Sequence, residues 1–206
     1  MAVVLPGKFV YLATPHTGSM AVAAALKNIN GAFSAYHKPR GIGHHATLKE
    51  VKRVCGDQLT GAEVVFTTIR NPYDVLATWY VRNEYHFQMR RLEEQLEREL
   101  TIRDFLELWL KLNTRPHLVN GRIFYHALEC QKVIRYENLQ GELNALMRKI
   151  PGTPGSVPLE RENPTPSKKH WSLYFDDPTY AWINEHFQAD FVDFGYPFIW
   201  GNTPYE

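Results

Sequence analysis

The chain reads Phe9-Val-Tyr-Leu-Ala-Thr14-Pro15-His16-Thr17-Gly18-Ser19-Met20, and Ala21-Val-Ala-Ala-Ala-Leu26 follows directly. The apolar, β-prone run predicts a strand over about 8–13, and the segment with Pro15 and Gly18 predicts a tight turn. The alanine-rich run predicts a helix over 19–28. A strand, a short loop and a helix N-terminus in this order present backbone N–H groups and a positive dipole end to an anion.

This loop is too short for the phosphate loop of nucleoside triphosphatases, which needs two spaced glycines followed by Lys and Ser or Thr. Only Gly18 is present, with Ser19 and Met20 after it. One phosphate could still be held by the amides of residues 17–20 and the hydroxyls of Thr17 and Ser19. The alternative is an ordinary βα turn with a serine N-cap.

A second anion-binding feature follows the run Glu63-Val-Val-Phe-Thr-Thr-Ile-Arg70, which predicts a buried parallel strand. Asn71 and Pro72 are typical of a helix start, so Arg70 ends the strand and Thr78 lies about two turns into the helix. Arginine suits bidentate contacts with anions, and a nearby hydroxyl would help to bind a second phosphate. The alternative is an ion pair between Arg70 and Asp74.

Strands alternate with helices along the rest of the chain. We expect a short strand over 32–36, a helix that Thr47 caps, a strand over 131–136, and helices over 89–112, 139–150 and 178–188. This order predicts an α/β fold with a parallel sheet covered on both faces. Ligands bind such sheets at the carboxyl ends of the strands, where the first loop and Arg70 both lie.

Composition narrows the class of protein. The chain has 206 residues, of which 44% are hydrophobic and 22% charged, and we expect one domain over 1–206. The Pro-rich segment 151–170 is a candidate lid. The net charge of +1 argues against a dedicated nucleic-acid partner. With two cysteines, no apolar run of membrane-spanning length and no leader pattern, we expect a cytoplasmic protein. Nothing indicates an oligomeric state.

Several segments together resemble the sulfotransferases that use 3′-phosphoadenosine 5′-phosphosulfate. These segments are the first loop, Arg70-Asn-Pro-Tyr-Asp74, Arg135-Tyr-Glu-Asn-Leu139 and Phe194-Gly-Tyr196. The similarity is greatest to the branch that contains carbohydrate sulfotransferases and small bacterial or phage members. It implies a P-loop-like three-layer fold with a central parallel sheet flanked by helices. It also implies an acceptor hydroxyl on a carbohydrate or small metabolite, no metal, and 3′,5′-adenosine bisphosphate as a product.

The resemblance also assigns nucleotide contacts. The loop residues Pro15, His16, Thr17, Gly18, Ser19 and Met20 would hold the 5′-phosphosulfate, and Arg70 with Thr78 would hold the 3′-phosphate. The family has a serine at the position of Thr78, and it has Lys or Arg in the loop where this chain has His16. A protonated His16 would replace that cation, and neighbouring phosphates would favour the protonated form. Lys168 and Lys169 are either a clamp over the 3′-phosphate or an exposed basic pair.

Sulfuryl transfer to a hydroxyl needs a base, and histidine titrates near the working pH. His45-Ala46-Thr47 matches a His followed by a small residue in the resembling branch, so His45 is the first candidate and His44 the second. Either one could instead be a surface or helix-capping histidine. Two rival functions stay open: a small ATP-dependent phosphotransferase, and an anion- or glycan-binding module without catalysis.

Overall fold

Residue contacts divide the chain into two units, which are described separately below. The sheet unit comprises Met1–Arg70 and Phe124–Pro164, and the helical unit comprises Asn71–Ile123 and Thr165–Glu206. The computed structural model describes residues 1–35, 43–83, 91, 93–95, 97–112, 118–160, 165 and 168–200. Parts of the predicted lid, residues 161–164, 166 and 167, lie outside the described residues. That the whole chain works as one sulfotransferase-like domain stays a prediction.

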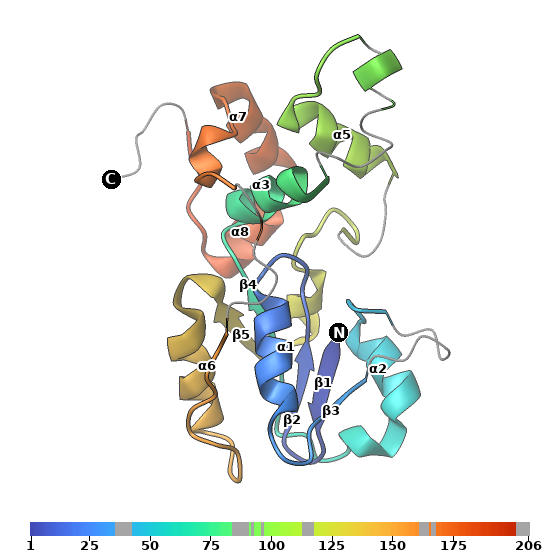
Figure 1. Ribbon diagram of the computed structural model, residues 1–206, viewed down its shortest axis with the longest axis vertical. Coiled ribbons are helices and arrows are strands. Elements are labelled where there is room, and N and C mark those ends of the chain that lie inside the picture. The colour runs from blue at the N-terminus through green and yellow to red at the C-terminus, as the bar shows by residue number, and fades with distance from the viewer. Residues whose placement is uncertain are drawn as a thin grey trace. The chain divides into compact units, whose positions relative to one another are not determined.

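The sheet unit is built on a five-stranded sheet with the order β3-β1-β2-β4-β5 (Figure 1). Its strands are β1 (Ala2–Leu5), β2 (Phe9–Leu12), β3 (Phe33–Ser34), β4 (Val64–Ile69) and β5 (Lys132–Arg135). The described residues of this unit also form the helices α1 (Ser19–Lys27), α2 (Leu48–Cys55) and α6 (Leu139–Met147) and the 3₁₀ helix η3 (Tyr125–Glu129). Shorter 3₁₀ turns are η2 (Gly56–Leu59) and η4 (Tyr136–Asn138). The α/β class and most predicted elements are confirmed.

The sheet is mixed, so the prediction of a wholly parallel sheet is wrong at one edge. β2, β4 and β5 run parallel, whereas β1 pairs antiparallel with both β2 and β3. Residues 6–8 form a tight turn in which Lys8 N–H donates to Leu5 O at 3.0 Å and Gly7 has φ +69°. A Pro-Gly turn between two apolar runs is typical of a hairpin. The prediction of a parallel sheet rested on the alternation of strands with helices and did not use this turn.

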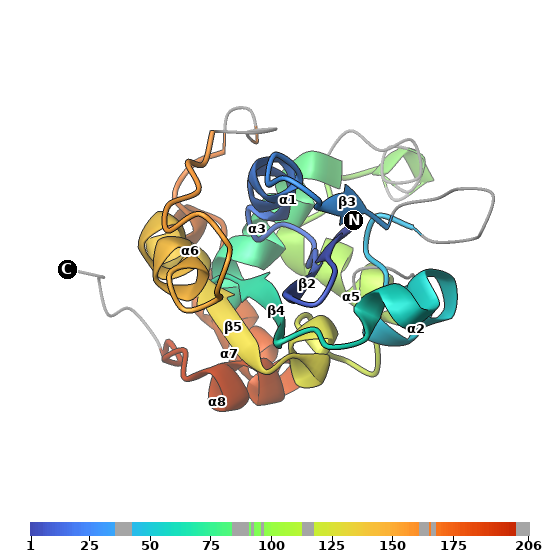
Figure 2. The ribbon, with the colours of Figure 1, turned by 90° about the horizontal axis from the view of Figure 1, so that it is seen from below.

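Alternating side chains give the sheet two apolar faces, and helices cover both. On one face the side chains of Val3, Leu5, Phe9, Tyr11, Phe66 and Ile134 pack against α1 and α6. On the other face those of Ala2, Val4, Val10, Leu12 and Val65 pack against α2. Figure 2 shows α1 and α6 along one side of the sheet and α2 along the other. The sheet unit therefore has three layers, and its parallel strands β2, β4 and β5 end at one common edge.

The helical unit contains α3 (Pro72–Asn83), α5 (Ile102–Leu112), η5 (Trp171–Leu173), α7 (Asp177–His186) and α8 (Gln188–Phe194). Tyr73 is the centre of its aromatic core, with ring centroids 4.8 Å from Phe191 and 5.3 Å from Trp171. The single helix predicted over 178–188 is two helices, because Phe187 has a non-helical backbone and separates α7 from α8.

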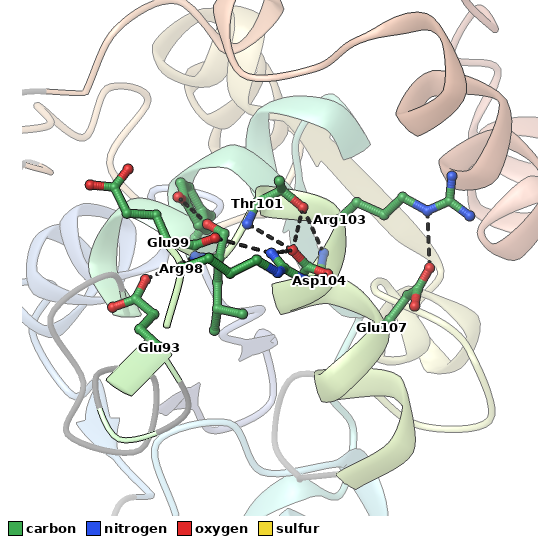
Figure 3. A network of polar contacts seen from close by, with 9 residues as sticks. Glu93, Arg98, Glu99, Thr101, Arg103, Asp104 and Glu107 are labelled. Atoms are coloured by element: carbon green, nitrogen blue, oxygen red, sulfur yellow. Dashed lines mark hydrogen bonds and ion pairs between the residues drawn. The ribbon is translucent and has the colours of Figure 1, made fainter. Parts of the chain in front are cut away.

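Residues 89–112 do not form the one helix that the sequence predicts. Residues 97–101 are not helical, and Glu97 has φ +52°. Thr101 and Asp104 exchange hydrogen bonds in a capping box: both the N–H and the hydroxyl of Thr101 donate to the Asp104 carboxylate, and Asp104 N–H donates to the Thr101 hydroxyl. Arg98 contributes two further bonds to the same carboxylate, at 2.7 and 3.0 Å (Figure 3). These contacts begin a new helix and hold the pKa of Asp104 well below its usual range.

Within the described residues, no helix combines the length and the apolar character that a bilayer crossing requires.

Replacing Asp104 tests whether this cap starts α5. We expect Asp104→Ala to lower the free energy of unfolding of the helical unit by about 1–2 kcal/mol, since the N–H and the hydroxyl of Thr101 lose the carboxylate that accepts from them. Arg98 is half-exposed, so Arg98→Ala is the matched control and should lower the free energy of unfolding less than Asp104→Ala does, because solvent screens an exposed ion pair. All five tryptophans lie in the helical unit, so tryptophan fluorescence during urea unfolding reports on this unit. Equal losses in the two variants would contradict the capping role.

Candidate functional site

Arg70 and the loop before α1 meet at one aromatic ring. The Arg70 guanidinium carbon lies 4.0 Å from the centroid of Tyr136, and Arg70 Nη1 donates to His16 O at 3.3 Å. A Cβ placed on Gly18 would come within 2.9 Å of two atoms of the same Tyr136 ring. The structure thus brings together the two strand ends that the sequence marks as anion-binding.

The register of the parallel strands explains this meeting. Leu12 pairs with Thr67 across β2 and β4, and Ile69 pairs with Arg135 across β4 and β5. Parallel strands end at a common edge, so the residues that follow them are neighbours. Tyr136 directly follows β5, as Arg70 directly follows β4, and the two side chains can stack.

Gly18 is required for two separate reasons. Its φ of +74° lies in the left-handed region that side chains disfavour. The Tyr136 ring also fills the space that a side chain at this position would need. His16 has φ +60° without being glycine, a conformation that is held only where the surroundings impose it.

A chain of buried hydroxyls fixes the loop to β4. Thr17 Oγ1 donates to Thr14 O at 2.9 Å and lies 2.6 Å from Thr68 Oγ1. Because the single proton of Thr17 is used for Thr14, Thr68 must donate to Thr17. Thr68 then accepts from the hydroxyl of Tyr11 at 3.1 Å. The protons therefore run in one direction, from Tyr11 through Thr68 and Thr17 to Thr14, and burial raises the pKa of Tyr11.

A second contact between hydroxyls binds the loop to β4 on the opposite face of the sheet. Thr67 Oγ1 donates to Leu12 O at 2.6 Å, so it accepts from Thr14 Oγ1 at 2.7 Å. Successive residues of a strand point to opposite faces, so Thr67 and Thr68 hold the loop from both sides. None of these threonines has exposed surface. Buried hydroxyls with all their protons donated give a loop with one well-defined conformation.

The other predicted loop residues differ in what they offer. Pro15 and Ser19 are buried, and Met20 is exposed. Because the hydroxyl of Thr17 donates its one proton to Thr14 O, that hydroxyl has no proton left for another acceptor. The first N–H groups of an α-helix have no carbonyl partner four residues earlier, so α1 presents amides at this end.

His45 lies at the end of β2 with a defined tautomer. Its Nδ1 is 2.7 Å from Ala13 O, and a carbonyl only accepts, so the neutral ring carries its proton on Nδ1. Nε2 then carries the lone pair, as a general base needs. His44, the other candidate, is exposed.

His126 is a buried histidine that the sequence did not single out. It has no exposed surface, and burial lowers its pKa to about 4, so its ring is neutral at neutral pH. Its Nε2 lies 3.2 Å from His45 O and therefore carries the proton. Its Nδ1 has no hydrogen-bond partner among the described residues, which is consistent with an unprotonated nitrogen.

Thr78, Lys168 and Lys169 belong to the helical unit. The buried Thr78 hydroxyl donates to Asp74 O at 2.7 Å, and Lys168 forms an ion pair with the Asp74 carboxylate. Asp74, which the sequence analysis considered as an ion-pair partner of Arg70, thus pairs with a lysine of its own unit. Lys169 is exposed, and its N–H donates to the Tyr174 hydroxyl at 3.1 Å. Nucleotide contacts for these three residues stay predictions.

Tyr136 is the main site residue that sequence reasoning missed. The rule that selected Arg70, a polar residue at the carboxyl end of a parallel strand, also selects Tyr136 after β5. Thr68 and His126 gave no comparable signal, because a threonine inside a strand and a histidine in a short turn are ordinary residues there.

Comparisons with protein families, with curated proteins and with solved structures give no match to this chain. Among the residues that the structure describes, no group of His, Cys, Asp or Glu side chains is arranged to hold a metal ion.

Thr17 offers a test of the hydroxyl chain. Thr17→Val keeps the shape but leaves the Thr68 proton and the Thr14 carbonyl without partners, so we expect a loss of about 1–3 kcal/mol in the stability of the sheet unit. Thr17→Ser keeps the hydroxyl, loses one methyl group and should cost about 0.8 kcal/mol. Amide hydrogen exchange in β2 and α1 is the readout, since the sheet unit has no tryptophan. Wild-type protection in Thr17→Val would contradict the deduced bond order.

Proposed function

We propose that this chain is a sulfotransferase, which moves a sulfuryl group from 3′-phosphoadenosine 5′-phosphosulfate to a hydroxyl of a carbohydrate or small metabolite. The observation that carries the proposal is the meeting of Arg70, the 14–20 loop and Tyr136 at one edge of the sheet. A donor with two separated anionic groups needs two anion-binding features at such an edge.

In this proposal the loop amides bind the 5′-phosphosulfate, and Arg70 binds the 3′-phosphate. Stacking on Tyr136 engages the face of the guanidinium, whereas its N–H donors lie in the plane and point outward. The cation–π contact therefore orients Arg70 without using the donors that a phosphate needs. Contributions of Thr78, Lys168 and Lys169 to the 3′-phosphate are proposed from the resemblance alone.

The proposed reaction is a direct, in-line transfer. The acceptor oxygen attacks sulfur, and the bond between sulfur and the bridging oxygen of the 5′-phosphate breaks. The bonding electron pair stays on that oxygen, and 3′,5′-adenosine bisphosphate leaves. Loop amides and the helix dipole of α1 stabilise the charge that develops there, and a protonated His16 would add a cation.

The acceptor proton is assigned to His45. Its neutral ring has Nδ1–H bound to Ala13 O, so Nε2 is the nitrogen that can take a proton. The acceptor itself is proposed only as a class, a hydroxyl compound.

Nucleotide affinity tests the role of Arg70. We expect Arg70→Ala to raise the Kd for 3′,5′-adenosine bisphosphate by about 100-fold in calorimetry, because charge-assisted bonds to a phosphate are lost. Arg53→Ala, which removes an exposed arginine of α2, is the matched control and should bind as wild type does. Unchanged affinity in Arg70→Ala would remove Arg70 from the site. Tighter binding of ATP than of the bisphosphate would favour a phosphotransferase.

Turnover tests the role of His45. His45→Ala should bind the bisphosphate normally and lose about 10²–10⁴-fold in kcat, measured with the sulfuryl donor and a panel of sugar and small-molecule hydroxyl acceptors. His44→Ala is the comparison variant and should retain turnover. The reverse result would assign the base to His44. A wild-type protein that binds donor and bisphosphate without any turnover would favour the non-catalytic binding module.

A further inference from the structure

We propose that His126 is a positioning residue, which holds the backbone of His45 so that the His45 ring keeps its proton on Nδ1. The inference rests on the proposed role of His45 as the base. It starts from the hydrogen bond of the buried His126 ring, which runs from Nε2 to His45 O at 3.2 Å.

His45 forms hydrogen bonds at two atoms, its carbonyl oxygen and its ring Nδ1. Its carbonyl accepts from His126, and its ring donates from Nδ1 to Ala13 O at 2.7 Å. Fixing the backbone on one side and the ring on the other restricts the side chain to a narrow set of rotamers. The bond from Nδ1 to Ala13 O selects the tautomer, since a neutral imidazole carries only one proton. The bond from His126 holds the backbone of His45 so that Nδ1 stays within reach of Ala13 O.

A second bond joins the same two segments three residues further along. Leu48 N–H, at the start of α2, donates to the Glu129 carboxylate at 2.9 Å. Thr47 and Glu50 close a capping box over that helix end. His126 and Glu129 both belong to η3, so η3 holds the turn that carries His45 at two points.

η3 is itself fixed to the sheet. Gln131 N–H donates to Val65 O at 2.9 Å, and Val65 N–H donates to the Gln131 side chain at 2.6 Å. The thiol of Cys130, the residue after η3, donates to His126 O at 3.2 Å, and within η3 the Tyr125 ring centroid lies 3.9 Å from that of His126. These contacts therefore connect the segment that carries His45 to β4, the strand that Arg70 follows.

The ring of His126 works here as a neutral donor. Burial lowers its pKa most, the hydrogen bond to His45 O and the Glu50 carboxylate raise it, and the amino group of Met1 lowers it. Because burial is the largest effect, the ring stays neutral through the range in which His45 would act as a base.

The first experiment measures the ring nitrogens of the wild-type protein by ¹⁵N NMR at neutral pH. We expect a proton on Nε2 of His126 and on Nδ1 of His45. A proton on Nδ1 of His126 would overturn the inference directly, because His45 would then receive no hydrogen bond from that ring. This measurement needs neither a variant nor a substrate.

The second experiment compares two variants. His126→Phe keeps a ring against Tyr125 but has no N–H, whereas His126→Gln keeps an N–H donor at a similar reach. We expect His126→Phe to populate both His45 tautomers and to lower kcat by up to about 10²-fold with unchanged Kd for 3′,5′-adenosine bisphosphate. His126→Gln should restore the Nδ1 tautomer and most of kcat.

The outcomes separate the two proposals. An unchanged His45 tautomer in His126→Phe would overturn the positioning role, whatever the turnover. Loss of nucleotide binding in a folded His126→Phe would also overturn it, since the effect would then not be confined to the base. An absence of turnover in the wild type, with the tautomers as expected, would reject the sulfotransferase and leave the positioning of His45 intact. If His126→Phe does not fold, His126→Gln and the wild-type spectrum still decide.

Discussion

The loop between β2 and α1 is tied to β4 by hydroxyl-to-hydroxyl bonds in a region without exposed surface. Thr68 and Thr67 take one face of the strand each, and they reach Thr17 and Thr14 across it. Every proton in these chains has a carbonyl or hydroxyl to accept it. An unmatched hydroxyl in such a place would cost more than the bond contributes, so the arrangement favours one loop conformation strongly over its neighbours. The rest of the candidate site depends on that loop.

This constraint also explains how two distant parts of the sequence come to share a site. β4 carries Thr67 and Thr68, and the next residues are Ile69 and Arg70. The strand that anchors the loop therefore also carries the arginine at its end, and Tyr136, directly after the neighbouring β5, lies against both Arg70 and Gly18. On the α2 face, η3 is bound to the same strand through Val65 and Gln131. The proposed anion-binding groups and the segment next to the proposed base are thus all attached to one strand, β4.

Much of this could be predicted from the sequence, and the reasons for the remainder are physical. The strands and helices around the first loop and Arg70 follow from apolar runs, turn residues and helix caps, which are local signals. The β1 hairpin was missed because alternation of strands and helices took precedence over a Pro-Gly turn. The interruption at residues 97–101 was missed because a run of charged helix formers hides a capping box formed by Thr101 and Asp104.

Hydrogen bonds between side chains that are far apart in the chain could not be predicted from the sequence. That Thr68 donates to Thr17, or that His126 binds the carbonyl of His45, depends on strand register and on distances that no spacing in the chain encodes. Thr78, Lys168 and Lys169, which are predicted to contact the 3′-phosphate, belong to the helical unit. In that unit Lys168 forms an ion pair with Asp74.

The most direct measurement is a crystal structure of the protein with 3′,5′-adenosine bisphosphate. The account predicts the 5′-phosphate against the amides of residues 17–20 and the 3′-phosphate within hydrogen-bonding distance of the Arg70 guanidinium, which should remain on Tyr136. A nucleotide bound elsewhere, or one whose phosphates contact neither Arg70 nor the loop, would contradict it.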